Sequence, residues 1–155
     1  MKTIITIIAI LLFPSFTFAM TNKEVLHGIN QVRAEHEVSP VRRNVALQRA
    51  AQERADYIAK TGKFEHGCVG VGDERRCPFE DAIERTGYVL WFAGENLAEF
   101  RKWDVPTLIL RWLKSKTHHD IMLDPIYRDL GVGIAQGGGH TYVVTLYALK
   151  WSAGK

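Results

Sequence analysis

The chain has 155 residues, of which 46% are hydrophobic and 24% are charged. Its mean hydropathy of -0.10 is that of an ordinary globular protein, which excludes a disordered or multiply membrane-spanning chain. The formal net charge of +3 is small and the basic residues are spread along the chain, so nothing in the charge favours binding to nucleic acid or to a membrane surface.

Residues 1–19 have the layout of a secretory signal peptide. Lys2 is followed by an apolar run from Ile4 to Phe13, and the segment ends at the small residue Ala19. The apolar run is well short of the roughly 20 residues that cross a bilayer, which argues against a permanent membrane anchor. We therefore expect cleavage after Ala19, a secreted or periplasmic protein, and one domain over residues 20–155.

Two helices are predicted at the start of that domain. Thr21 and Glu24 have the capping-box pattern, and apolar residues at helical spacing continue to about Glu37. The second helix is expected from Asn44 to a stop at Gly62. Its apolar stripe consists of Leu47, Ala51, Ala55 and Ile58. Because two of these residues are alanines, we expect another element to pack closely against this helix.

The segment from Lys63 to Pro78 is a long, glycine-rich loop that contains both cysteines. Exported chains fold in an oxidising compartment, so we expect Cys68 and Cys77 to form a local disulfide that staples the loop. The alternative makes both cysteines thiolate metal ligands beside His66. That alternative is disfavoured, because soft tetrahedral sites usually recruit more cysteines.

Helix and strand alternate in the remainder of the domain. A short helix is expected over Phe79–Arg85, a strand over Tyr88–Ala93 and a further helix from Asp104 onwards. A final hairpin pairs Leu130–Ala135 with Thr141–Leu149 across a glycine-rich turn. This order predicts an α+β domain in which helices pack on a small antiparallel sheet.

Four short motifs follow one another along the domain. They are the segment from Ala50 to His66, the run Gly94-Glu95-Asn96-Leu97-Ala98, the segment from Trp112 to His118 and the segment from Tyr127 to Gly133. In this order they resemble the bacterial SCP-domain branch of the CAP superfamily, which groups cysteine-rich secretory proteins, antigen five and pathogenesis-related one proteins. The resemblance implies a three-layer α-β-α sandwich with a cleft that carries two histidines and two acidic residues.

Residue matching assigns this cleft to His66, Glu95, His118 and Ser115. His66 and His118 stand where the family has its two histidines, and Glu95 stands where the family has one acidic residue. Ser115 occupies the position at which animal and plant members carry the second acidic residue. Activities that require a second carboxylate therefore do not carry over from the family.

Two interpretations of the cleft remain open at this point. Two imidazoles and a carboxylate can hold a divalent cation such as Zn²⁺, so His66 and His118 as ligands with Glu95 as base would make a metal-dependent peptidase or esterase. In the other interpretation, Glu95 only orients an imidazole within a polar cluster. We favour the second, in a non-enzymatic module that binds a lipid, a sterol or a protein partner. Ser115 and His118 also have the helical spacing of a nucleophile pair, but a serine before a helical segment is more often a cap.

Overall fold

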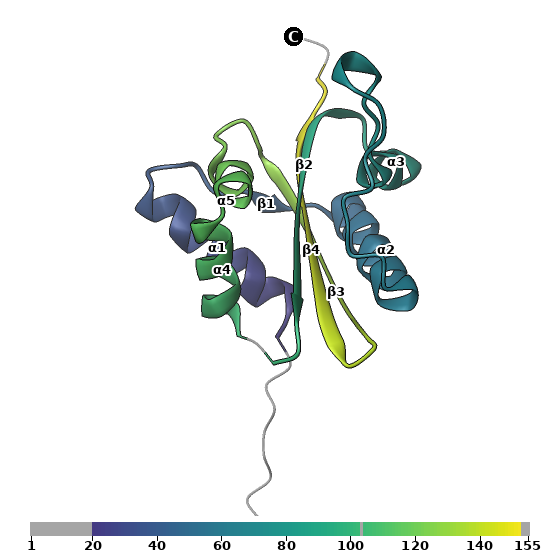
Figure 1. Ribbon diagram of the computed structural model, residues 1–155. Coiled ribbons are helices and arrows are strands. Elements are labelled where there is room, and N and C mark those ends of the chain that lie inside the picture. The colour runs from purple at the N-terminus through teal and green to yellow at the C-terminus, as the bar shows by residue number, and fades with distance from the viewer. Residues whose placement is uncertain (1–19, 103, 153–155) are drawn as a thin grey trace, which may run out of the picture.

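The computed structural model describes residues 20–102 and 104–152, so the predicted signal peptide lies outside the described residues. In this part of the chain the helices form two layers that enclose one sheet (Figure 1). One layer holds α1 (Asn22–Glu35), α4 (Val105–Lys114) and α5 (Lys116–Leu123), and the other holds α2 (Val45–Thr61) and α3 (Pro78–Arg85). The predicted α-β-α sandwich is thereby confirmed. No helix of the described residues has the length and apolar character needed to cross a membrane.

The sheet has the strand order β1-β3-β4-β2, with β1 at Arg42–Arg43, β2 at Leu90–Phe100, β3 at Asp129–Gly137 and β4 at His140–Lys150. The three long strands are antiparallel, as predicted. The two-residue strand β1, which was not predicted, runs parallel to β3 and makes the sheet mixed. A segment as short as Arg42–Arg43 is too short to show the alternating hydrophobic pattern of a strand. Only its pairing with β3 makes it a strand.

Strand β2 extends well beyond the predicted Tyr88–Ala93. It begins at Leu90 and continues through Glu95 and Asn96 to Phe100, paired with β4 along its length. Glycine, glutamate and asparagine are weak strand formers, and the ladder to β4 overrides that local preference. The candidate acid therefore lies inside an edge strand rather than in a loop.

The first helix follows its predicted start and stops earlier than expected. The Thr21 hydroxyl accepts from the Glu24 amide at 3.3 Å, and the Glu24 carboxylate accepts from the Thr21 amide at 2.7 Å, which completes the capping box. The helix ends at Glu35 rather than near Glu37, because Glu37 adopts a left-handed conformation with φ of 57°. Helix α2 has the predicted caps, Asn44 and Gly62.

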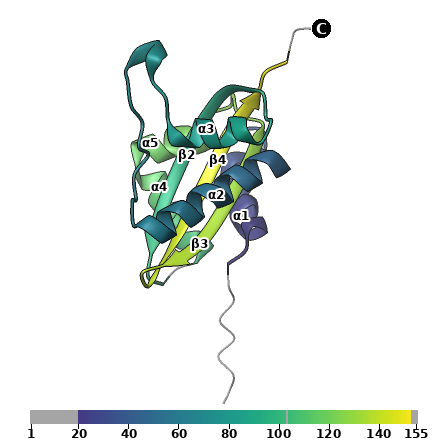
Figure 2. The ribbon, with the colours of Figure 1, turned by 90° about the vertical axis from the view of Figure 1, so that its right-hand side faces the viewer.

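Helix α2 lies directly against β3 and β4, as Figure 2 shows. Close approach is possible because glycines on β3 face the alanine-rich stripe of the helix. A Cβ atom on Gly133 would lie 2.0 Å from the carbonyl oxygen of Ala51, and one on Gly131 would lie 2.2 Å from the backbone of Leu47. The expected close packing is confirmed, and it depends on the absence of side chains at these two positions.

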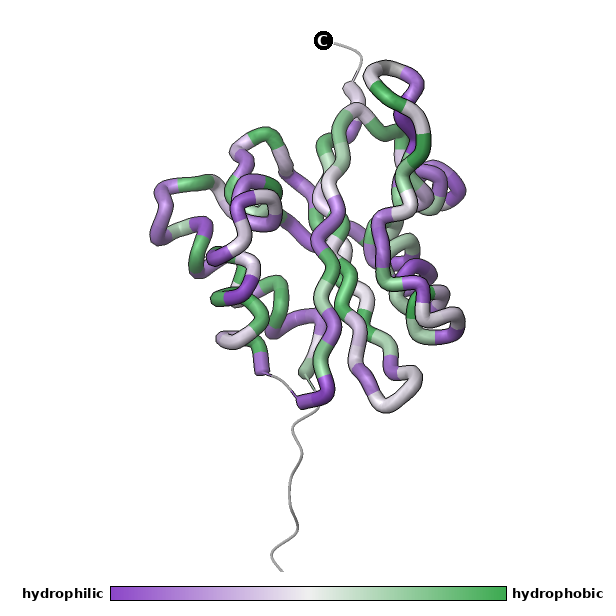
Figure 3. Tube along the Cα trace, viewed as in Figure 1, coloured by the Kyte–Doolittle hydropathy of each residue, from purple (hydrophilic) through white to green (hydrophobic). Residues whose placement is uncertain are grey.

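Alternate residues of the sheet serve two separate cores. Figure 3 shows how hydrophobic and hydrophilic residues are interspersed along the strands and helices. On β4, Val143 and Tyr147 pack toward α1 and α4, whereas Val144 and Leu146 pack toward α2. The same alternation on β2 points successive residues of the Gly-Glu-Asn run toward opposite layers. The two faces of the sheet therefore carry different parts of the candidate site.

The loop between α2 and α3 is closed by the predicted disulfide between Cys68 and Cys77. A bridge between Val69 and Arg76 and a short 3-10 helix at Gly72–Glu74 give the loop further structure. Cys77 is also the N-cap of α3. The disulfide therefore ties the strand-like arm that begins near His66 to the start of a packed helix.

Candidate functional site

Glu95 is the buried centre of the candidate site. Its side chain is fully buried on the face of β2 that meets α2, where it forms an ion pair with Arg54. The Arg54 Nε donates to Glu95 Oε1 at 2.9 Å, and its Nη2 donates to Oε2 at 3.3 Å. Two charge-assisted hydrogen bonds to one carboxylate fix the orientation of both side chains.

Sequence reasoning missed Arg54. A signal was present, because Arg54 lies among Ala51, Ala55 and Ile58 on the apolar stripe of α2. A charged residue on a buried helix face requires a partner of opposite charge or several hydrogen bonds. Besides Glu95, Arg54 donates to the main-chain carbonyl of Glu65 at 3.2 Å. This contact attaches the start of the disulfide loop to the buried pair.

His66 contacts the second oxygen of the same carboxylate. Its Nδ1 lies 2.9 Å from Glu95 Oε2, and because an ionised carboxylate can only accept, Nδ1 is the donor. The imidazole side chain is 44% exposed, whereas that of Glu95 is not exposed at all. Glu95 therefore orients His66, and Nε2 is the ring nitrogen that this contact does not use.

His118 reaches the site from the opposite layer. It lies on α5, where its main-chain carbonyl accepts a 3.0 Å hydrogen bond from the Asn96 side-chain amide. Its ring centroid is 6.5 Å from that of Trp112. Burial lowers the pKa of His118, and the charge that His66 can carry lowers it further. His118 therefore favours the neutral form, and its pKa responds to the charge of His66, which is bonded to the neighbouring strand residue Glu95.

Ser115 separates the two helices that precede and contain His118. Its extended conformation, with φ of -102° and ψ of 116°, ends α4 and begins α5. Its side chain makes no capping hydrogen bond to α5. Among the described residues, no hydrogen bond joins the Ser115 side chain to His118. The bend at Ser115 instead sets the direction of α5, and with it the position of His118.

The residues present fit a divalent cation only in part. Across residues 20–102 and 104–152, no three His, Cys, Asp or Glu side chains are arranged to hold a metal ion. Cys68 and Cys77 are used in the disulfide, and both oxygens of Glu95 are engaged. The donors that remain are the imidazoles of His66 and His118. A protein site with two imidazoles needs water or a ligand to complete the coordination of Zn²⁺.

A polar groove of about 370 Å³ lies beside the buried ion pair. It is bounded by α2, the disulfide loop and the first turns of α3. Its lining residues are Glu53, Arg54, Tyr57, Lys63, Glu65, Gly67, Pro78, Asp81 and Arg85. Because the lining carries both signs of charge, the groove suits a polar ligand better than an apolar one.

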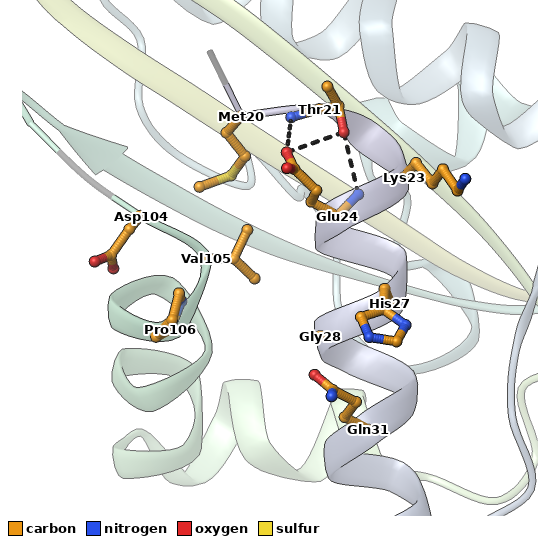
Figure 4. Close-up of a pocket in the computed structure, with 10 residues that line it drawn as sticks. All are labelled: Met20, Thr21, Lys23, Glu24, His27, Gly28, Gln31, Asp104, Val105 and Pro106. Carbon is orange, nitrogen blue, oxygen red and sulfur yellow. Dashed lines mark hydrogen bonds between the residues drawn. The ribbon is translucent and has the colours of Figure 1, made fainter. Parts of the chain in front are cut away.

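A larger cavity of about 680 Å³ lies in the other layer, between the starts of α1 and α4. Figure 4 shows Met20, Val105 and Pro106 along one side of it, with His27 and Gln31 projecting from α1. None of the four expected cleft residues lines this cavity. His66 and His118 are therefore not part of this larger cavity.

The chain is similar to known proteins in both sequence and fold. The sequence model of the cysteine-rich secretory protein family, CAP, matches residues 26–148. The chain belongs to the CAP family.

Its CAP domain is 26% identical over 117 residues to the uncharacterized protein YkwD of Bacillus subtilis (strain 168), covering 75% of this chain and 43% of YkwD. It is 25% identical over 114 residues to the uncharacterized membrane protein YlbC of the same organism, covering 74% of this chain and 31% of YlbC. The chain thus spans less than half the length of these two relatives.

Solved structures share the fold of this CAP domain. An extracellular protein with an SCP domain from Bacillus anthracis superposes with a TM-score of 0.69 at 20% identity, covering 83% of this chain and 40% of that one. An outer surface protein from Borrelia burgdorferi superposes with a TM-score of 0.70 at 15% identity, covering 83% of this chain and 92% of that one. The bacterial SCP-domain resemblance of the four motifs is therefore confirmed at the level of the fold.

Proposed function

We propose that this CAP-domain protein is an exported, non-enzymatic module that binds a partner at the cleft between His66 and His118. The observation that carries the proposal is the state of Glu95. Its side chain is fully buried, and its two oxygens are bonded to Arg54 and His66. A carboxylate held in this way supports a binding surface rather than the activation of water.

A hydrolytic role for Glu95 would require it to leave the ion pair. A general base must lie within hydrogen-bond reach of the water that it deprotonates. Movement of Glu95 toward a water would leave the Arg54 guanidinium buried without its counter-ion, which is strongly unfavourable. The geometry therefore favours an orienting role for Glu95 over the metal-dependent hydrolase.

The histidine pair and the adjacent groove supply the binding surface. His66 is half-exposed and oriented, and His118 favours its neutral form, so each imidazole can donate or accept a hydrogen bond from a ligand. The groove beside Arg54 carries charges of both signs. Among a lipid, a sterol and a protein, this lining favours a polar segment of a protein as the partner.

Export is part of the proposal and has two supports. Residues 1–19 have the composition of a signal peptide, and the disulfide between Cys68 and Cys77 is typical of a protein that folds outside the cytosol. A fusion of the full chain to a reporter that is active only after export tests this directly. Activity of the fusion that disappears when residues 1–19 are deleted is the expected result.

Binding at the cleft is tested with a phage-displayed random peptide library, panned against the protein without its leader. We expect enriched peptides whose affinity falls about tenfold or more in His66→Ala and in His118→Ala. The matched control is His27→Ala, which changes an exposed histidine of α1. Peptides that bind all variants equally, or no enrichment at all, would contradict the proposal.

The rival enzyme is tested in parallel with a panel of peptide and ester substrates in the presence of Zn²⁺. We expect no turnover above that of Zn²⁺ alone. Turnover that requires His66 and His118 and is abolished by Glu95→Gln would instead support the metal-dependent hydrolase.

A further inference from the structure

Four buried polar atoms on the α1 and α5 side of the sheet have no hydrogen-bond partner among the described residues. They are Arg33 Nη2, Asn96 Oδ1, Thr145 Oγ1 and the Tyr147 hydroxyl oxygen. All four residues are 0% exposed. Buried polar atoms nearly always have a hydrogen-bond partner, because burial removes their hydrogen bonds to water and an unpaired atom forms none in exchange. A group of four on one face therefore requires an explanation.

The four atoms belong to one region. Thr145 and Tyr147 are two apart on β4 and so project from the same face, and Asn96 on β2 lies directly opposite Thr145 in the strand register. The Arg33 side chain enters from α1. Burial raises the pKa of Tyr147, whereas the Thr145 hydroxyl and the Arg33 charge lower it, which accords with the three groups lying in one region.

The donors and acceptors of this group complement one another through a bridging molecule. The Asn96 amide nitrogen already donates to the His118 carbonyl, so its Oδ1 can only accept. Arg33 Nη2 can only donate, and the two hydroxyls can do either. Water donates two hydrogen bonds and accepts two, and it commonly joins three buried polar groups.

The Arg33 guanidinium is only partly satisfied by protein acceptors. Its Nε donates to the Ser39 carbonyl at 2.9 Å, and its Nη1 donates to the Met122 carbonyl at 2.7 Å. Among the described residues, no carboxylate forms an ion pair with it. A buried positive charge is unfavourable unless its donors are paired, so an acceptor at Nη2 would stabilise this guanidinium.

We propose that Arg33, Asn96, Thr145 and Tyr147 form a binding site for ordered water in the core behind the cleft. The water accepts from Arg33 and donates toward Asn96 Oδ1, and the hydroxyls complete its shell. Because it holds the oxygen end of the Asn96 amide, it keeps the nitrogen end directed at the His118 carbonyl. Asn96 is then a positioning residue for His118, whatever the cleft binds.

Two shape-preserving substitutions test the site through the sign of their effect. Thr145→Val and Tyr147→Phe remove one hydroxyl each and leave the packing nearly unchanged. If the hydroxyls bind water, each substitution removes a satisfied hydrogen bond and lowers the urea midpoint. If the hydroxyls are unpaired, each substitution removes a penalty and the midpoint stays constant or rises, which overturns the proposal. Tyr127→Phe is the matched control, since it changes a neighbouring ring, 5.7 Å from that of Tyr147, outside the four-atom group.

A direct measurement identifies the occupant. Water-selective nuclear Overhauser spectra should show cross-peaks between long-lived water and both the Thr145 methyl and the Asn96 side-chain amide. Tyr147→Phe should weaken those cross-peaks and shift the His118 amide resonance, whereas Tyr127→Phe should do neither. Absence of the cross-peaks, together with resonance shifts that follow a chloride titration, would show that an anion rather than water occupies the site. Neither readout involves a cleft ligand, so failure here and failure of the binding proposal are distinguishable.

Discussion

Arg54 of α2 and Glu95 of β2 are joined by two hydrogen bonds, of 2.9 and 3.3 Å, inside the layer where helix and sheet meet. The same carboxylate holds His66 at 2.9 Å. The buried Glu95 carboxylate therefore links the packing of α2 to the orientation of the partly exposed His66 imidazole. Substitutions in this network are expected to affect stability and the cleft together.

Arg54→Met is expected to lower the free energy of unfolding by about 3–5 kcal/mol, because it leaves the Glu95 carboxylate buried without its principal partner. Urea denaturation at neutral pH measures the loss. Arg85→Met is the matched control, since it removes an exposed ion pair to Glu53 that should contribute less than about 1 kcal/mol. The double variant Arg54→Met, Glu95→Leu should recover much of the stability, and equal losses in Arg54→Met and Arg85→Met would contradict this account.

His118 is expected to make the protein less stable in mild acid. Burial first, and His66 second, lower the pKa of His118 below its ordinary value of 6.5. The unfolded chain therefore takes up the proton at a higher pH than the folded chain. Above pH 6.5, His118 is neutral in both states and does not reduce the free energy of unfolding. That free energy falls as the pH drops from 6.5 to the pKa of His118 in the folded protein, and below this pKa His118 causes no further loss.

Two measurements check the behaviour of His118. Urea midpoints across this pH range should decline less steeply in His118→Gln than in the natural protein. In a titration followed by nuclear magnetic resonance, His66→Ala should raise the pKa of His118 but leave it below 6.5, because the burial remains. A His118 that titrates at or above 6.5 in the natural protein would refute the prediction.

Gly133→Ala is expected to destabilise the domain by about 1–3 kcal/mol or more, because its Cβ would lie 2.0 Å from the Ala51 carbonyl oxygen. Backbone atoms of a packed helix cannot move aside locally, so α2 would have to shift away from β3. Gly28→Ala is the matched control, since its new Cβ would meet the movable side chain of Val105 at 2.8 Å. Thermal unfolding of both variants should show a clearly larger drop for Gly133→Ala, and the reverse order would contradict the packing argument.

Removal of the disulfide by Cys68→Ser with Cys77→Ser is expected to cost about 2–3 kcal/mol, the chain-entropy value for a loop of this length. Urea denaturation of the natural protein with and without a reductant should show the same difference. The double variant should be insensitive to the reductant. Loss of the staple should also broaden the resonances of His66, which precedes Cys68 by two residues, and unchanged resonances would show that Glu95 alone orders the loop.

Local sequence was sufficient to determine much of the fold. The caps Thr21, Asn44 and Gly62 and the glycine-rich turn of the hairpin act through contacts within a few residues, so they could be read directly. The pairing of Cys68 with Cys77 was equally local. The motif containing Glu95 indicated the family, and the family match over residues 26–148 bears this out.

Long-range packing decided the rest. Arg54 carries no local mark that identifies Glu95, 41 residues away, as its partner. The strand pairing of Arg42 and Arg43, and the extension of β2 through Glu95, follow from ladders to distant segments. Likewise, only the folded sandwich joins His66 to Glu95 and the Asn96 amide to the His118 carbonyl. The face on which a side chain lies is set by its own segment, whereas its neighbours are set by the whole chain.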